Sequence, residues 1–348
     1  MTLYIGVDFH PHQQTVCWCD LETGEIKTRN LFHNSPDLKK FYQNFPRAIV
    51  GIEASTNAPW FEKLLLETNH QLVVGNPSLI RAKAVSRHKS DKRDAELIFE
   101  LLCQNRFPVL WRRPLASTNI LEILKLRLSL VKQRTQICNR LQSLAHGFGL
   151  PKGRVRTKVF QAVILQQEVD EVQELQRNQL FTSLENLDKQ IIELETWLQK
   201  KAENDRQGQL LMTQKGVGYL SALTVVHTLG DVSRFTDLNK QIVAFAGLDP
   251  LEKSSGGKVK MGSISKKGSW MLRFMLGQAG NIAARYDAKL KGFKQRLGKK
   301  KVKAVVKTAV ARKLLVKLAI MLKQEISAQE FDQRGSTVGN ARLPQGQK

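Results

Sequence analysis

The chain has 348 residues, of which 55 are Lys or Arg and 31 are Asp or Glu, so its formal net charge is +24. With 42% hydrophobic and 25% charged residues, the composition is that of a globular protein and excludes a disordered or collagenous chain. No run approaches about 18 apolar residues, so we expect no membrane span. Four cysteines favour a reducing, cytoplasmic location over a disulfide framework.

The positive charge is concentrated in one stretch. Residues 253–324 contain 20 Lys or Arg and a single acid, Asp287. The stretch mixes these basic residues with apolar residues at helical spacing, and it also contains Gly-rich loops. This pattern predicts a nucleic-acid-binding segment rather than a membrane-binding one. A solubilising surface is the alternative, although such surfaces usually mix both signs of charge.

Residues 1–112 predict a mixed α/β layer. Ser35 is placed to cap the first helix, and the turn at residues 22–25 predicts a hairpin between the second and third strands. The resulting order is β-β-β-α-β-α-β-α. We expect strands at 3–7, 15–20, 26–32, 48–52 and 71–74, helices at 36–45 and 59–68, and further helices from residue 77.

The rest of the chain is predicted to be helical. In residues 113–205, apolar side chains recur every three or four positions in two stretches, which indicates a helical hairpin or coiled coil with a basic loop at 151–158. This segment is either a dimerisation or RNA-gripping arm or a plain spacer. Residues 206–330 predict a C-terminal domain of helices and basic loops, and residues 331–348 predict a disordered tail.

Four acids have positions that suggest chemistry. Asp8 and Glu53 each end an apolar strand, and Asp91 and Asp94 lie three residues apart on a helix that Ser90 is placed to cap. Carboxylates gathered in one pocket repel one another and stay ionised only beside a cation, and oxygen ligands suit Mg²⁺ or Mn²⁺. Taken singly, each acid is also explained as a turn residue or as part of a first helical turn.

Three blocks carry a family resemblance: Tyr4-Ile5-Gly6-Val7-Asp8, Val50-Gly51-Ile52-Glu53-Ala54 and the segment Lys89–Ala95. They resemble the RuvC-like DEDD domain of the insertion-sequence 110 family of transposases, relatives of the pilin-gene DNA invertase. The resemblance implies an RNase H-like fold in which the first and fourth strands are neighbours and Asp8 lies beside Glu53. His10 and His12 follow Asp8 where the family more often has a small residue and a lysine, and we interpret both as loop residues.

The C-terminal part resembles the second domain of the same family. Lys215-Gly216-Val217-Gly218 is similar to a helix-hairpin-helix turn, and residues 245–273 contain the family's GLxP…SG…GxISKxG…LR signature. In that family a serine of this domain acts beside the acidic site, which here implies Ser255, with Ser254 as the runner-up. The alternative for Ser255 is a flexible loop residue that contacts phosphate.

Basic residues around both blocks are predicted to contact nucleic acid. The helix at 304–323 is predicted to have an apolar side, including Val305, and a phosphate-facing side that includes Lys317. The predicted nucleic-acid-binding residues are Lys89, Lys92, Arg93, Lys215, Lys253, Lys258, Lys260, Lys266, Lys267 and Arg273.

The resemblance implies a transposase or site-specific recombinase in which a Mg²⁺ or Mn²⁺ site at Asp8, Glu53, Asp91 and Asp94 acts with Ser255. It implies a transient phosphoserine link to DNA, donor and target DNA chosen by a structured bridge RNA, and a dimer or tetramer. It also implies a bacterial or archaeal protein that associates with the nucleoid when active. Two alternatives remain: a RuvC-like junction-resolving endonuclease that uses water as the nucleophile, and a non-catalytic nucleic-acid-binding protein.

Overall fold

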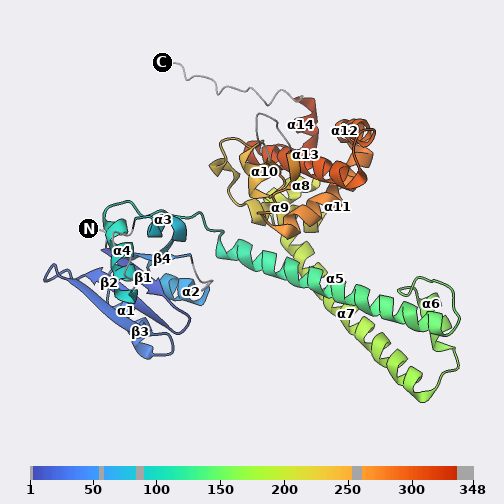
Figure 1. Cartoon of the computed structure of the whole chain (residues 1–348), viewed down its shortest axis with the longest axis horizontal. Helices are drawn as coiled ribbons and strands as arrows, with labels where there is room; N and C mark the ends of the chain where they lie inside the picture. The colour runs from blue at the N-terminus through green and yellow to red at the C-terminus, as the bar shows by residue number, and fades with distance from the viewer. Residues whose placement is uncertain (1–2, 55–58, 84–89, 253–260, 335–348) are drawn as a thin grey trace. The chain divides into compact units, whose positions relative to one another are not determined.

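The computed structural model describes residues 3–54, 59–83, 90–252 and 261–334. The chain divides into two compact units, Met1–Arg112 and Arg113–Lys348 (Figure 1). The α/β character of the first unit and the mainly helical character of the second agree with the predicted fold class.

The first unit is built on a mixed five-stranded sheet. Its strand order is β3-β2-β1-β4-β5, with β1 antiparallel to β2 and parallel to β4. The predicted adjacency of the first and fourth strands is therefore confirmed, and it is consistent with an RNase H-like fold. The strands are β1 Leu3–Phe9, β2 Gln13–Cys19, β3 Ile26–Phe32, β4 Ala48–Glu53 and β5 Gln71–Gly75.

Helices cover both faces of this sheet. Helices α1 (Pro36–Gln43) and α2 (Pro59–Glu67) pack on one face, where Ile5 and Val7 share a core with Tyr42 and Phe61. Helices α3 (Pro77–Arg81) and α4 (Asp91–Cys103) pack on the other face. Ser35 caps α1 as predicted, because its side chain accepts a hydrogen bond from the Asp37 amide.

Two paired glycines let α4 lie directly against the sheet. Gly6 of β1 and Gly51 of β4 are register partners, so they form a side-chain-free patch across neighbouring strands. A Cβ atom on Gly6 would lie 2.4 Å from both the Ala95 carbonyl oxygen and the Phe99 amide nitrogen of α4. Because side chains alternate between the faces of a strand, Asp8 points to the same face as Gly6 and therefore toward α4.

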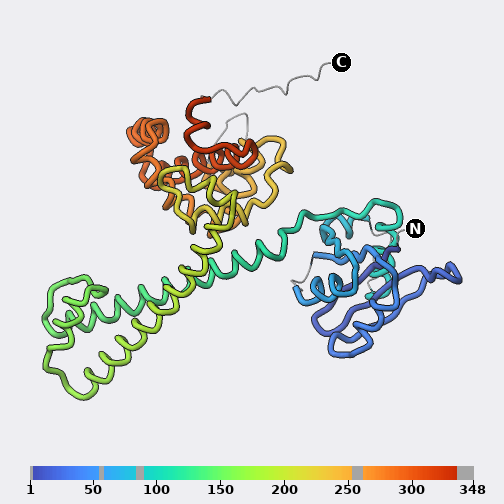
Figure 2. Tube along the Cα trace, turned by 180° about the vertical axis from the view of Figure 1, so that it is seen from behind, coloured from blue at the N-terminus to red at the C-terminus, as the bar shows by residue number. Residues whose placement is uncertain are grey.

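The second unit begins with a long helical arm. Helices α5 (Leu115–Gly147) and α7 (Glu171–Glu203) run side by side, with the short helix α6 (Lys158–Leu165) between them in sequence (Figures 1 and 2). Apolar residues line their contact, and ion pairs join Arg127 to Glu195 and Arg134 to Asp188 across it. The predicted helical hairpin is thus present.

The remainder of the second unit is a helical bundle with one small hairpin. Leu121 and Leu198 of the arm share a core with Leu223 of α9 and Met271 of α11, so the arm's base and the bundle pack together. The expected border at residues 205/206 stays a prediction. The bundle contains α8 Arg206–Met212, α9 Tyr219–Leu229, the 3₁₀ turn Val232–Arg234, α10 Gln241–Phe245, β6 Pro250–Glu252, β7 Met261–Ile264, α11 Trp270–Tyr286, α12 Ala288–Gly298, α13 Lys303–Gln324 and α14 Ala328–Gln333.

The structure corrects the sequence interpretation of α13. Lys317 does not face solvent: its side chain is 7% exposed and its Nζ lies 2.9 Å from a carboxylate oxygen of Asp287 and 2.9 Å from one of Asp332. Burial opposes ionisation of Asp287, but hydrogen bonds from the Leu290 amide and Lys317 hold its pKa below the usual value. Val305, expected on the apolar side, is 48% exposed.

Two further expectations concern the tail and the membrane. Helix α14 extends to Gln333, so the expectation of disorder from residue 331 is wrong for the first three positions. Residues 335–348 lie outside the described part of the chain. Among the described helices, none has the length and apolar character needed to cross a membrane.

The contact at Gly6 generates a stability prediction. We expect Gly6→Ala to lower the free energy of unfolding by about 3 kcal/mol, because the new methyl group overlaps the α4 backbone and the helix must shift. Gly51→Ala is the matched control: its Cβ meets the movable tip of Leu102 at 2.8 Å, so we expect a loss of about 1 kcal/mol. Urea denaturation combined with hydrogen exchange of the α4 amides measures both, and equal losses would contradict the prediction.

Candidate active site

Two of the four predicted acids lie at the same edge of the sheet. Val7 and Ile52 are partners in the parallel pairing of β1 with β4, and Asp8 and Glu53 are the next residues of these strands. Their side chains are 16% and 21% exposed. Parallel pairing therefore places beside each other two carboxylates that are 45 positions apart in the sequence.

The other two acids lie in the first turn of α4. The Ser90 hydroxyl accepts a hydrogen bond from the Arg93 amide at 3.3 Å and so caps the helix as predicted. Asp91 and Asp94 follow within one turn, and the negative charge of each acts on Asp8. The close packing of α4 at Gly6 thus carries both acids to the end of β1.

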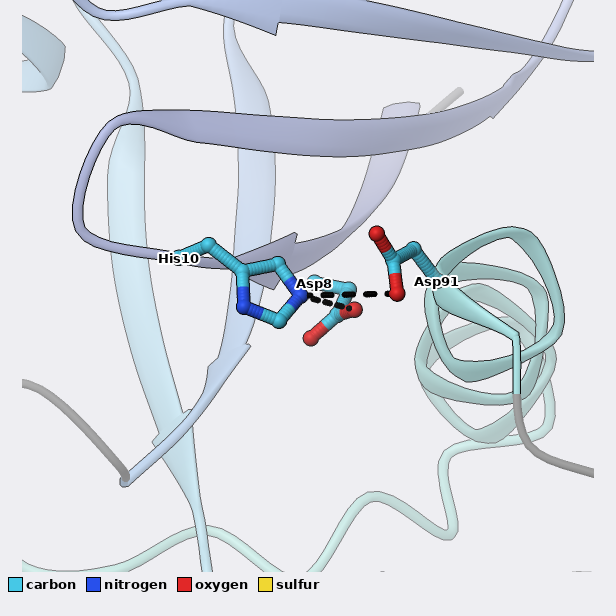
Figure 3. A group of neighbouring side chains, drawn as sticks. All are labelled: Asp8, His10 and Asp91. Atoms are coloured by element: carbon cyan, nitrogen blue, oxygen red, sulfur yellow. Dashed lines mark hydrogen bonds and ion pairs between the residues drawn. The ribbon is translucent and has the colours of Figure 1, made fainter.

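His10 lies between two of the predicted acids, which the sequence interpretation did not foresee. Its Nε2 atom lies 3.0 Å from Oδ2 of Asp8 and 3.6 Å from Oδ1 of Asp91, between the two carboxylates (Figure 3). His10 follows the last residue of β1, so its interpretation as a loop residue agrees with the structure, and its place beside the acids adds it to the candidate ligands. The signal was strand alternation, because residues 8 and 10 share a face.

The turn that carries His10 is held by hydrogen bonds from the neighbouring strand. The His10 amide donates to the Gln13 carbonyl at 2.9 Å, and the His33 amide donates to the His12 carbonyl at 2.9 Å. His33 Nδ1 lies 3.2 Å from the Pro11 carbonyl oxygen, and burial lowers the pKa of His33. A neutral His33 donates a hydrogen bond to this carbonyl and so fixes the turn. His12 is exposed to solvent and is not among the residues that contact the acids.

The electrostatics at Asp8 match a cation site. Burial raises the pKa of Asp8, the negative charges of Asp94 and Asp91 raise it further, and His10 opposes this change. One ligand atom each from Asp8, His10 and Asp91 lie within 4.8 Å of one another. A divalent cation among these groups would relieve the repulsion, so the donor set fits a metal ion that accepts mostly oxygen ligands.

Glu53 has a different local partner. Nη2 of Arg81, on α3, lies 3.1 Å from Oε1 of Glu53. The structure thus joins Asp8 and Asp91 through His10, while Glu53 is next to Asp8 by strand pairing and forms an ion pair with Arg81. Arg81 was absent from the predicted site, and nothing in its sequence context distinguishes it from other surface arginines.

In the second unit, strands β6 and β7 flank the predicted serine. Glu252 and Met261 are partners in this antiparallel pair, so the segment between them joins two bonded strands. Ser254, Ser255, Lys253, Lys258 and Lys260 belong to this segment and lie outside the described residues. Lys89 of the first unit also lies outside them.

The family signature around this hairpin has a structural basis. Gly247 has a φ of +65°, and a Cβ there would lie 2.7 Å from the Lys267 and Gly268 amide nitrogens, so the two loops touch backbone to backbone. Nη1 of Arg273 donates to the carbonyls of Ala246 and Gly268 at 3.0 and 2.7 Å. Arg273, predicted to contact nucleic acid, therefore also ties these loops together.

The remaining predicted basic residues are at the surface. Arg93 is exposed, and Lys92 lies 3.8 Å from Glu96 one turn further along α4. Lys215, on the turn between α8 and α9, is exposed, as are Lys266 and Lys267 after β7. Their exposure is compatible with phosphate contacts, which stay a prediction.

Comparison with protein families matches both parts of the chain. A transposase model, the DEDD domain of the IS110 type, matches residues 5–148, and the model described as "Transposase IS116/IS110/IS902 family" matches residues 208–295. The first match contains Asp8, Glu53, Asp91 and Asp94, and the second contains the β6–β7 hairpin. The chain belongs to the IS110 family of transposases.

Relatives in three bacteria agree with this assignment. A "Probable family 20 transposase" of Pseudomonas aeruginosa is 28% identical over 278 residues, covering 78% of this chain and 77% of the relative. The transposase for IS1111A of Coxiella burnetii is 32% identical over 197 residues, covering 55% and 54%. The transposase for IS1328 of Yersinia enterocolitica is 26% identical over 285 residues, covering 80% and 83%.

As an IS110-family transposase of an insertion sequence, the protein binds, cleaves and rejoins DNA. This result excludes the non-catalytic nucleic-acid-binding protein. DEDD domains typically use divalent metal ions, in agreement with the carboxylate arrangement at Asp8.

The raised pKa of Asp8 generates a prediction about the metal-free protein. A raised pKa in the folded state means that ionised Asp8 lowers stability at neutral pH, and that the loss is relieved as the pH falls through that pKa. We expect Asp8→Asn to leave the metal-free fold at least as stable at pH 7 while lowering DNA cleavage about 10³-fold. Thermal unfolding in a chelator and cleavage assays measure the two effects.

Asp20→Asn is the control, because the pKa of Asp20 is lowered in the folded protein whereas that of Asp8 is raised. The Lys27 ammonium and two backbone amides hold the pKa of Asp20 at about 2, so its neutralisation removes favourable contacts. We expect this variant to unfold earlier at pH 7 and to keep cleavage activity. A marked loss of stability in Asp8→Asn would contradict the assignment of Asp8 to a repulsive acid cluster.

Proposed function

We propose that Asp8, Glu53, Asp91 and Asp94 bind Mg²⁺ or Mn²⁺ and act together with Ser255 in DNA strand exchange. The observation that carries the metal site is the convergence of Asp8 and Asp91 on one histidine nitrogen at the end of β1 (Figure 3). The bound cation would stabilise negative charge on the scissile phosphate. His10 would hold the Asp8 carboxylate in place.

In the proposed reaction the Ser255 hydroxyl attacks a DNA phosphodiester. A bond forms between Oγ and phosphorus, the bond from phosphorus to one deoxyribose oxygen breaks, and the hydroxyl proton passes to a base while the leaving oxygen gains a proton. A second DNA end then attacks the phosphoserine and releases Ser255. One phosphodiester is made for each one broken, so strand exchange needs no external energy source.

The support for Ser255 comes from the signature that surrounds it. Blocks on both sides of residues 253–260 match the family pattern, and the described ends of the segment are paired strands whose adjoining loops are tied together by the Arg273 contacts. A serine hydroxyl needs a base, a metal or a positive environment to become a nucleophile, and the basic sequence around Ser255 supplies positive charge.

We further propose that a structured noncoding RNA of the element selects the donor and target DNA, and that the protein acts as a dimer or tetramer. The net charge of +24 favours binding of both nucleic acids. Recombination joins two duplexes, which favours more than one protomer, and the α5–α7 arm offers an elongated surface for RNA or for a second chain.

The serine assignment predicts a covalent adduct. With Mg²⁺ and labelled DNA bearing the element's end, we expect the wild-type protein to form a DNA–protein species that survives a denaturing gel. Ser255→Ala should abolish the adduct, because no other group is proposed to bond to phosphorus, while Ser254→Ala should keep it. Chelation of the metal should also abolish it.

These variants separate the recombinase from a nuclease that uses water. Cleavage that persists in Ser255→Ala without an adduct would identify water as the nucleophile. An adduct that is lost in Ser254→Ala and kept in Ser255→Ala would move the nucleophile by one residue. DNA binding should be unchanged in both variants, which shows that each protein is folded.

A further inference from the structure

A basic groove lies between helices α11, α12 and α13 of the second unit. Its volume is about 860 Å³, and uncharged side chains including Asn281, Ala284 and Val306 form the rest of its lining. It lies within the basic stretch 253–324, and the described residues singled out above as nucleic-acid-binding do not line it. Six cations line it: Arg285, Lys291, Lys294, Lys301, Lys303 and Lys307.

These cations lack acidic partners. Within the described ranges, none of the six forms an ion pair, and none of the residues that line the groove is acidic. Asp287, the acid nearest in sequence, is paired with Lys317 instead. The positive charges therefore repel one another until an anionic ligand enters.

The cations form two rows that face the groove. Lys291 and Lys294 are three residues apart on α12, and Lys303 and Lys307 are four apart on α13, so each pair lies on one side of its helix. Two rows of ammonium groups suit an extended sugar–phosphate backbone better than a compact anion. No described lining residue is aromatic, so the groove offers no platform for stacking the bases of a single strand.

The groove is next to the hairpin that flanks Ser255. A smaller hollow of about 390 Å³ is lined by Pro250 of β6 and Gly262 and Ile264 of β7, together with Arg312 of α13. Lys301 lines both hollows and so connects the groove to the hairpin. The groove and the hollow at the hairpin therefore meet at Lys301.

We propose that the α12–α13 groove binds the backbone of the duplex DNA that adjoins the phosphodiester attacked by Ser255. The position of the groove in the reaction rests on the proposed function, whereas its affinity for DNA does not. Duplex DNA is favoured because the chain is a transposase and because the lining has cations without aromatic rings. In this role the groove binds phosphates of the DNA backbone whatever the base sequence, and it does not recognise bases.

The test measures binding without chemistry. In a Ser255→Ala background without divalent metal, anisotropy of a labelled DNA duplex of arbitrary sequence gives Kd over a range of salt concentrations. We expect the double variant Lys291→Gln/Lys294→Gln to bind at least tenfold more weakly near about 0.15 M salt. The slope of log K against log salt should fall by about 1.8, which corresponds to two lost phosphate contacts.

A matched control removes two charges elsewhere in the same unit. Arg206 of α8 and Lys240, which precedes α10, are exposed residues outside the arm and the groove, and Arg206 pairs with Glu325 at 2.9 Å. The double variant Arg206→Gln/Lys240→Gln should bind DNA like the parent. An equal loss in this control would mean that total charge rather than the groove determines affinity, and would overturn the proposal.

Two further measurements complete the test. Unchanged DNA binding by the groove variant overturns the proposal, and a loss confined to an RNA duplex of the same sequence assigns the groove to RNA instead. With Ser255 restored and DNA saturating, the groove variant should regain the parent's adduct yield, because the lysines bind rather than react. A parent that binds DNA through the groove but forms no adduct would refute the nucleophile and leave the groove assignment standing.

Discussion

The contact between α4 and the glycine pair of β1 and β4 determines the candidate site. With Gly6 and Gly51 side by side, no side chain separates the helix from the sheet, and the first turn of α4 reaches the end of β1. Each glycine is two residues before an acid, so the alternation that turns the glycines toward the helix also turns Asp8 and Glu53 toward it. The same strand geometry therefore determines both the close packing of α4 and the position of the acids. A bulkier residue at position 6 or 51 would disturb the helix contact and the acid positions together.

The two units handle like charges in opposite ways. In the first unit the chain supplies its own compensation, since His10 lies between Asp8 and Asp91 and Arg81 pairs with Glu53. In the groove of the second unit no described acid compensates the cations that line it. The acid cluster therefore has partners within the chain, which a cation bound at the proposed metal site would replace. The basic groove has no such internal partner, so only a bound anion neutralises it.

Periodicity predicted the regular elements well, and it failed where a contact depends on a distant partner. The sheet was predictable because its strands are apolar and bounded by turns, whereas β6 and β7, with three and four residues among Gly, Ser and Lys, give no alternation to detect. Adjacency of Asp8 and Glu53 came from the family resemblance and not from their spacing. Lys317 was misplaced because helical spacing does not reveal a buried ion pair. The only acid of the basic stretch, Asp287, was the available signal for it.

The buried ion pair of Lys317 also has a consequence for α12. Asp287 caps the start of α12 through the Leu290 amide and pairs with Lys317 of α13, so the direction of α12 is fixed from inside the bundle. The outer residues of α12 take no part in this anchor. Substitutions at these outer residues therefore leave the anchor intact, and α12 keeps its direction when the charge that it presents to the groove is changed.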